Sequence, residues 1–426
     1  GITVVTQPNQ LVTNAAAKDE YSARFGMVTG GFIKRFCTIL WGMVGLAAIL
    51  LYTGKVQNSD LVWGYATRDL LGSLKIGLVG LMVSSMMAAL MSTADALMLT
   101  VSGLLLHNVY RPLVKKQSDM QNVWMGRVFG AAFLVGGAII TTRFDNILEI
   151  LKFVWEFFVI FAAAFWLGLK WRRANRQGAW ASIILTLLIF YLLPLLVPGL
   201  FPAMRQNEHL LLETQPEPIE RTYTARDGDV EERQLEIDAW MDLSEEEKAY
   251  RPQPEPLLAG EPFSKTFNLP SKSIFWSKQA GLDEQGVMTA RGYLFPELLL
   301  IHSMGIDLSQ KPYALNESIR MLIRLIFPFL VLILVSLFTR ENKDEVTERF
   351  FLKMRTRVRG KGAKVDEQDL KESYSRPEET RNVLLFPSTS LEVYKWNRQD
   401  ITGFLIAVLV VFVVIGTLFL AVNIGS

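Results

Sequence analysis

The chain has 426 residues, of which 50% are hydrophobic and 20% are charged. Its 44 basic and 42 acidic residues give a formal net charge of +2, a balance that by itself excludes no class of protein. We expect no nucleic-acid partner. The single cysteine, Cys37, excludes a disulfide within the chain and a metal site built from cysteines. The hydrophobic residues form long runs with few charges, which is typical of a protein that crosses a bilayer.

Seven apolar segments are each long enough to cross a bilayer, which predicts an all-α polytopic membrane protein. In chain order they are 36–52, 76–106, 128–141, 147–169, 179–200, 321–338 and 401–422. The second segment has about 30 residues and would rise about 45 Å, so we expect it to tilt or to extend beyond the membrane. The sequence begins with Gly1 and shows no secretory signal, so we expect the printed chain to lie within a longer protein.

Basic residues mark alternate connections between these segments. They gather before the first segment, in 107–127, in 170–176 and after 338, whereas 142–146 holds only one. Because basic residues prefer the cytoplasmic side of short connections, this pattern predicts that the N-terminal end lies inside and Ser426 outside. We therefore expect a multi-pass protein of the plasma (inner) membrane.

Two regions are too polar to cross a bilayer. Residues 201–310 carry 20 acidic and 10 basic residues and follow the fifth span, which predicts an extracytoplasmic acidic insert. Within it we expect a helix near 231–240 and an apolar stretch, 293–304, that is too short to span and either packs on the insert or lies in the membrane interface. Residues 340–400 are predicted to form a charged cytoplasmic linker, whose basic run is either a solvated flank or a contact with anionic lipid.

The predicted organisation ends with two further spans. Arg320 and Arg324, at the outer end of the sixth span, are expected to snorkel toward the membrane interface. The predicted domains are the membrane core 1–200, the insert 201–310, a transmembrane helix within 311–339, the linker 340–400 and a C-terminal transmembrane helix within 401–426.

Two adjacent hydroxyl side chains, Ser92 and Thr93, lie inside the second span among Ala, Leu and Met residues. A sodium ion in a membrane must exchange its water for several fixed oxygens, and hydroxyls and carbonyls supply these oxygens without adding buried charge. The carbonyl of Ala89 falls on the same helix face, where small residues let a neighbouring helix come close. The alternative is that both hydroxyls only bond back to their own helix.

Carboxylates within spans are costly and are candidates for function. Asp95 lies three residues after Ser92 and either supports or gates an ion site or makes a structural hydrogen bond. Glu149, Lys152 and Glu156 share one face of the fourth span, and this spacing favours a paired structural face. The scattered histidines predict no metal site other than sodium, and we expect no cofactor and no enzyme activity, since no catalytic motif is present.

Three motifs follow one another at 9–24, 87–111 and 165–179. The first contains Asn-Gln-Leu-Val, Ala-Ala-Ala-Lys and Ala-Arg; the second contains Met-Ala-Ala-Leu-Met-Ser-Thr-Ala-Asp-Ala-Leu and ends His-Asn-Val-Tyr-Arg; the third reads Phe-Trp-Leu-Gly-Leu-Lys-Trp-Arg-Arg-Ala-Asn-Arg-Gln-Gly-Ala. In this order and spacing they resemble the sodium/solute symporter family over about residues 7–200.

The resemblance implies a leucine-transporter fold built from two inverted helix repeats. The first four spans would correspond to core helices seven to ten, so that this chain would hold a partial bundle and the N-terminal half of the same transporter would be missing. The resemblance also implies that the Ala89 carbonyl and the Ser92 and Thr93 hydroxyls bind sodium, with further ligands on the first core helix, and that the tenth core helix, which carries Glu156, lines the solute pathway.

The expected function is therefore sodium-coupled uptake of a small polar solute, such as a sugar, an amino acid or a carboxylate, by alternating access. The expected partners are a sodium ion, the solute and the lipid bilayer. The alternative is a transporter-derived sensor or scaffold that binds a partner through the 201–310 insert without pumping. A flux measurement distinguishes the two, because a sensor would bind without sodium-dependent accumulation.

Overall fold

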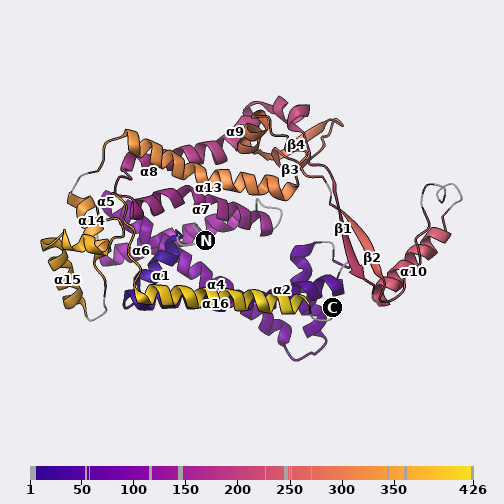
Figure 1. The fold of residues 1–426 in the computed structure, drawn as a ribbon, viewed down its shortest axis with the longest axis horizontal. Helices are drawn as coiled ribbons and strands as arrows, with labels where there is room; N and C mark the ends of the chain where they lie inside the picture. Colours follow the sequence, from indigo (N-terminus) through magenta and orange to yellow (C-terminus); the bar gives the residue numbers. More distant parts are fainter. Residues whose placement is uncertain are drawn as a thin grey trace. The chain divides into compact units, whose positions relative to one another are not determined.

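The computed structural model describes residues 6–423 except 53–54, 57, 115–117, 143–146, 226, 244–247, 249, 251, 270, 343–344 and 359–361. Gly1, the basis for expecting a longer protein, lies outside the described residues. Ser426, which was expected outside the cell membrane, also lies outside them. The chain divides into two compact units, one made of residues 1–184 and 327–426 and the other of residues 185–326 (Figure 1).

The first unit is helical. Its elements, some of which continue into the second unit, are α1 (Pro8–Ala15), α2 (Glu20–Tyr52), η1 (Ser59–Leu61), α3 (Val62–Ala66), η2 (Thr67–Leu71), α4 (Leu78–Leu105), η3 (Leu106–Tyr110), α5 (Arg111–Leu113), α6 (Asp119–Thr141), α7 (Ile147–Lys170), α8 (Arg176–Leu187), α13 (Tyr313–Phe338), α14 (Glu345–Arg355), α15 (Ala363–Ser375), η7 (Glu379–Val383) and α16 (Arg398–Val422).

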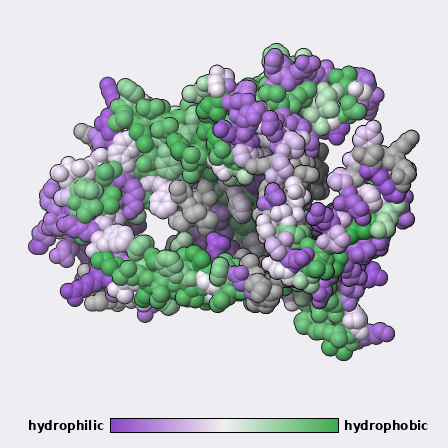
Figure 2. Space-filling view, turned by 45° about the vertical axis from the view of Figure 1, so that its right-hand side comes forward, coloured by the Kyte–Doolittle hydropathy of each residue, from purple (hydrophilic) through white to green (hydrophobic). Residues whose placement is uncertain are grey.

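The seven predicted spans are confirmed among the described residues. Helices long and apolar enough to cross a membrane occupy Glu20–Tyr52, Leu78–Leu113, Asp119–Thr141, Ile150–Lys170, Arg176–Leu200, Tyr313–Phe338 and Arg398–Leu420. Their apolar side chains form broad green bands on the surface in Figure 2, and Leu50 is 85% exposed, as expected for side chains that face lipid. The second span continues past its predicted end at residue 106 through a π-helical turn, Leu106–Tyr110, and is therefore longer than predicted.

Polar residues before the spans fix where several helices begin. Asp19 accepts a hydrogen bond from the Ser22 N–H at 2.7 Å, immediately before α2. This bond stabilises the carboxylate and lowers the pKa of Asp19. Ser118 and Gln121 form a capping box at the start of α6, so a polar signal, and not the apolar run itself, sets the helix start.

Contacts between helix ends agree with alternate crossing of the membrane. Arg24 on α2 pairs with Asp400 at the start of α16, with 2.8 Å between nitrogen and oxygen. The N–H of Ile147, the first residue of α7, donates to Asp60 in the connection between α2 and α4 at 3.2 Å. The starts of α2 and α16 therefore lie together, and the end of α2 and the start of α7 lie near each other.

The third sequence motif makes a close helix contact. Asn175 is buried and accepts a hydrogen bond from the Gly178 N–H at 2.8 Å, while its amide nitrogen donates to Thr339 at 2.6 Å. A methyl group added to Gly178 would lie only 2.9 Å from the carbonyl oxygen of Leu332 and would also collide with the Ser336 hydroxyl. Only glycine allows the start of α8 to approach the last turns of α13 so closely.

The predicted linker 340–400 contains folded elements that pack on the end of α7. Glu392 is fully buried and accepts from Arg355, whose Nε lies 2.9 Å from the carboxylate. Arg172, just after α7, lies 3.7 Å from the same carboxylate and also pairs with Glu348 on α14. Because a buried carboxylate needs compensating charge, these ion pairs fix α14 against the α7–α8 turn.

The second unit combines short helices with two small sheets. Its elements, besides parts of α8 and α13, are η4 (Leu188–Leu192), α9 (Leu193–Leu200), η5 (Pro202–Gln206), η6 (Glu208–Leu210), β1 (Glu217–Thr224), α10 (Asp227–Met241), β2 (Pro262–Leu269), β3 (Trp276–Leu282), β4 (Met288–Leu294) and α12 (Pro296–Ser303). Strand β1 pairs antiparallel with β2, and β3 pairs antiparallel with β4. The helix expected near 231–240 lies within α10.

The core of the second unit explains why 293–304 does not span a membrane. Leu294, Phe295 and Leu298 are buried together with Phe275 and Trp276 in one apolar cluster. The expectation that this stretch packs on the insert is therefore confirmed. Among the described residues both sheets lie in this unit. The predicted all-α class therefore applies to the membrane-spanning part of the protein.

The expectation that Arg320 and Arg324 snorkel is wrong. Both are buried, with 2% and 4% of their surface exposed. Arg324 pairs with the buried Glu297 at 2.7 Å, and the Arg320 guanidinium lies 4.5 Å from the centre of the Phe295 ring. Burial raises the pKa of Glu297, an effect that the charge of Arg324 opposes. The two arginines contact side chains of the same unit and do not reach toward water, because a carboxylate and an aromatic ring lie beside them.

Gly178→Ala is expected to lower the thermal stability of the protein. The added methyl would push α8 away from Leu332 and Ser336, and overpacking of this kind costs about 1–3 kcal/mol. The measurement is the melting temperature of the detergent-purified protein, followed by size-exclusion chromatography after heating. Gly168→Ala on α7 is the matched control, because no atom lies within 4 Å of its added methyl, and it should leave the melting temperature unchanged or slightly raised. Equal melting temperatures for the two variants would contradict the close helix contact.

Candidate ion site on helix α4

The contact between α4 and α6 determines which face of α4 is free. Gly130 on α6 is buried against α4, where an added methyl would lie 2.6 Å from the Met98 side chain and 3.1 Å from the Ser102 hydroxyl. Ser102 on α4 is also buried; Thr100 is buried too, but it lies on the opposite side of the helix, seven residues after Thr93. With 3.6 residues per turn, the side of α4 that holds Met98 and Ser102 is therefore committed to α6.

The predicted sodium ligands lie on the other side of α4. Ala89, Ser92 and Thr93 are exposed and, by helical spacing, lie away from Met98 and Ser102. The hydroxyl of Thr93 donates to the carbonyl of Ala89, with 3.2 Å between the two oxygens. The structure thus brings two of the three predicted oxygens together on a face that bulky side chains do not cover.

The hydrogen bond from Thr93 to the carbonyl of Ala89 is the geometry expected if the hydroxyls only bond back to their own helix. It satisfies the hydroxyl hydrogen, but the hydroxyl oxygen and the carbonyl oxygen each keep lone pairs that can accept further interactions. The hydrogen bond and an ion-binding role are therefore compatible. Ser85 makes the same kind of bond two turns earlier, to the carbonyl of Leu81 at 2.8 Å, so back-bonding alone does not identify a site.

The two candidate carboxylates lie in different surroundings. Asp95 is exposed and one helical turn beyond Ser92; because it lies seven residues before Ser102, it shares the side of α4 that carries Met98 and Ser102. Glu156 is half-buried on α7. The side chain of Glu149 lies outside the described residues, so its predicted pairing with Lys152 is not described.

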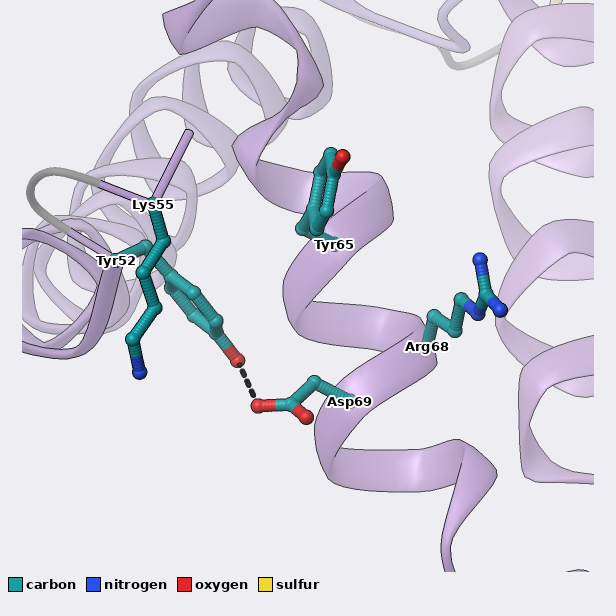
Figure 3. A pocket seen from close by; sticks show the side chains of 5 residues that line it. All are labelled: Tyr52, Lys55, Tyr65, Arg68 and Asp69. Carbon is teal, nitrogen blue, oxygen red and sulfur yellow. Dashed lines mark hydrogen bonds between the residues drawn. The ribbon is translucent and has the colours of Figure 1, made fainter. Parts of the chain in front are cut away.

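Sequence reasoning missed a polar cavity of about 360 Å³ between the end of α2 and η2 (Figure 3). It is lined by Tyr52, Lys55, Tyr65, Arg68 and Asp69, and the Tyr52 hydroxyl donates to Asp69 at 2.9 Å. Figure 3 shows Arg68 pointing away from the Tyr52–Asp69 pair. The only signal in the sequence was the concentration of polar and aromatic side chains between two spans.

Acidic, histidine and cysteine side chains form no metal-binding cluster of three among the described residues. The oxygens available on α4 are neutral hydroxyls and carbonyls with one nearby carboxylate, a donor set that suits a hard cation of low charge.

Comparisons with known proteins add a family to this picture. The model of the Sodium:solute symporter family matches residues 2–186. Sodium/glucose cotransporter 1 of Oryctolagus cuniculus is 30% identical over 41% of this chain and 29% of its own length. Osmoregulated proline transporter OpuE of Bacillus subtilis is 26% identical over 43% of this chain and 38% of its own length. The Sodium/proline symporter of Escherichia coli is 27% identical over 25% of this chain and 22% of its own length. No solved structure matches the chain.

The seven candidate spans among the described residues and these similarities indicate a multi-pass integral membrane protein. Residues 2–186, less than half of the chain, resemble the Sodium:solute symporter family. The family and the relatives named above are transporters and not enzymes. The chain spans about two fifths or less of the length of these relatives. The matched segment contains α4 and all five predicted site residues.

Gly130→Val is expected to disturb the packing that orients α4. The larger side chain would displace Met98 and Ser102, at a cost of about 1–3 kcal/mol, and would turn the hydroxyl face. Gly126→Val, one turn earlier on α6, is the matched control, because no atom lies within 4 Å of its added Cβ. The melting temperature of the purified protein should fall for the first variant and stay near the parent value for the second. An unchanged value for Gly130→Val would show that α6 does not constrain α4.

Proposed function

We propose that the full-length protein is a sodium-coupled secondary active transporter that moves a small polar solute by alternating access. The supporting observation is the pair of oxygens, from Ala89 and Thr93, on a free face of a helix within the segment that matches the symporter family. A sugar and an amino acid such as proline are the leading solute classes, because the named relatives are a glucose cotransporter and proline transporters. A carboxylate is a further candidate.

The proposed ion site consists of the Ala89 carbonyl and the Ser92 and Thr93 hydroxyls. The Thr93 and Ala89 oxygens are 3.2 Å apart, a spacing that fits neighbouring ligands about 2.3–2.6 Å from a hard cation. These oxygens are neutral, so an occupied site would carry only the charge of the ion. Further ligands would come from a segment that covers this face of α4, and small side chains such as Ala88 and Ala96 would allow its close approach.

Asp95 has a supporting role in this proposal. A carboxylate one turn from Ser92 makes the local potential more negative and so favours a cation, without occupying a ligand position. Glu156 would line the solute pathway on α7, where a half-buried carboxylate can accept hydrogen bonds from a polyol or from the ammonium group of an amino acid.

The coupling mechanism follows from linkage. A sodium ion that joins α4 to a neighbouring element stabilises the conformations in which the two are close, and a solute that binds the same conformations more tightly is then coupled to the ion. Moving one positive charge through 100 mV supplies about 2.3 kcal/mol, and the concentration gradient adds to this.

The double variant Ser92→Ala/Thr93→Ala is expected to lose sodium-stimulated uptake. Each oxygen that binds a charged partner contributes about 1.5–3 kcal/mol, so the sodium affinity should fall about tenfold or more for each oxygen lost. The measurement is uptake of labelled glucose and proline into proteoliposomes that contain the full-length protein, with and without an inward sodium gradient.

Ser85→Ala is the control for this experiment. It removes a back-bonded hydroxyl from the same side of α4, two turns away, and should leave uptake unchanged. Undiminished sodium stimulation in the double variant would refute the proposed site. Solute binding by the parent protein without any sodium-dependent accumulation would instead favour the sensor or scaffold alternative.

A further inference from the structure

Helix α14 carries an exposed apolar stripe outside the seven spans. Val346, Phe350 and Met354 are 74%, 42% and 43% exposed, and Val358, just beyond the helix, is 48% exposed. The first three follow one another at intervals of four residues, so they lie on one face of the helix. A stripe of this size on a short charged helix, in a region that is not itself a span, calls for an apolar or interfacial environment.

Basic side chains border this stripe. By helical spacing, Lys353 and Arg349 lie beside Phe350 and Met354, and Arg357 continues the same side; all three are exposed. The one acidic neighbour described on this side, Glu345, is paired with Arg349 at 2.5 Å. The α14 face, defined as the apolar stripe with these three basic residues, is therefore both apolar and positively charged.

The opposite side of α14 is fixed to the protein. Phe351, Leu352 and Arg355 are buried, and Arg355 is held by Glu392. Glu348, also on this side, pairs with Arg172. The helix therefore cannot roll to bury the α14 face without breaking buried ion pairs.

The same contacts place α14 near the level at which two spans end. Arg172 lies two residues after Lys170, the last residue of α7, and it pairs directly with α14. Phe338 ends α13, and α14 begins at Glu345, seven residues later. The headgroup layer lies where the apolar part of a span ends, so α14 is within reach of that layer.

We propose that the α14 face is a docking surface for the anionic headgroups of the membrane in which the protein lies. An apolar stripe bordered by basic residues is the composition of a helix that lies in the interface plane, with its apolar side chains at the boundary of the acyl chains and its basic side chains at the phosphates. The charge of the face complements anionic lipid, and the position of the helix brings it to the membrane surface. This docking would make the α7–α8 turn sensitive to lipid composition, and it does not depend on which solute is transported.

The test is to measure whether the α14 face contacts lipid in the intact protein. A fluorophore is attached at Phe350→Cys in the full-length protein, with its other cysteines, including Cys37, replaced. The protein is then placed in nanodiscs of phosphatidylcholine with or without phosphatidylglycerol, and quenching by lipids with brominated acyl chains is recorded. We expect strong quenching that increases with phosphatidylglycerol. A probe at Glu367→Cys, exposed on α15, should show little quenching.

Charge variants make the test specific. Arg349→Gln/Lys353→Gln/Arg357→Gln should weaken the lipid-contacting state about a hundredfold, or about fivefold for each base removed, and so abolish the dependence on phosphatidylglycerol. The matched control removes three exposed basic residues off the α14 face, Lys364, Lys371 and Arg376, and should behave like the parent.

Three results would overturn the proposal: no quenching at position 350, quenching independent of phosphatidylglycerol, or equal effects of the two triple variants. Shielding of the probe that depends on protein concentration and not on lipid would identify a second copy of the chain as the occupant and would also overturn it.

Discussion

The close contact of α6 with α4 at Gly130 is the constraint on which the candidate site depends. In a bilayer the apolar side chains of two helices gain little by leaving lipid, so helices associate where small residues allow close packing. Gly130 provides such a point, and it commits the Met98–Ser102 side of α4 to α6. The hydroxyls of Ser92 and Thr93 are left on the free side as a direct geometric consequence.

The hydroxyl groups on α4 also show how a span could carry the proposed ion site at low cost when no ion is bound. A polar group without a partner in a bilayer costs several kcal/mol, but Thr93 satisfies its own hydrogen with the Ala89 carbonyl. An arriving cation needs only the lone pairs that this bond leaves free. A back-bonded hydroxyl and the proposed sodium ligand are thus compatible interpretations of Thr93, and the sequence alone could not separate them.

The sequence predicted the spans well because their signal is local. A run of apolar residues long enough to cross a bilayer needs no knowledge of its neighbours, and the same holds for the helix within α10. Predictions failed where a distant partner decides the outcome. Arg320 and Arg324 were expected to reach toward water, but Glu297 and Phe295, brought beside them by folding, bury them. The pairing of β1 with β2 also depends on residues far apart in the sequence, whereas β3 and β4 form a local hairpin that the sequence analysis did not identify.

The ion pairs at the end of α7 constrain how the helices can move. Arg172 lies within the segment that matches the symporter family, whereas Glu348 and Glu392 lie outside it. Glu392 is fully buried with Arg355, and separating a buried pair leaves an uncompensated charge at a cost of about 3–5 kcal/mol. A movement that separated α14 from Glu392 would have to meet this cost, and the same carboxylate lies 3.7 Å from Arg172, just after α7. Helix α14 and the turn after α7 are therefore expected to move as one body, so that a force applied to α14 acts directly on the end of α7.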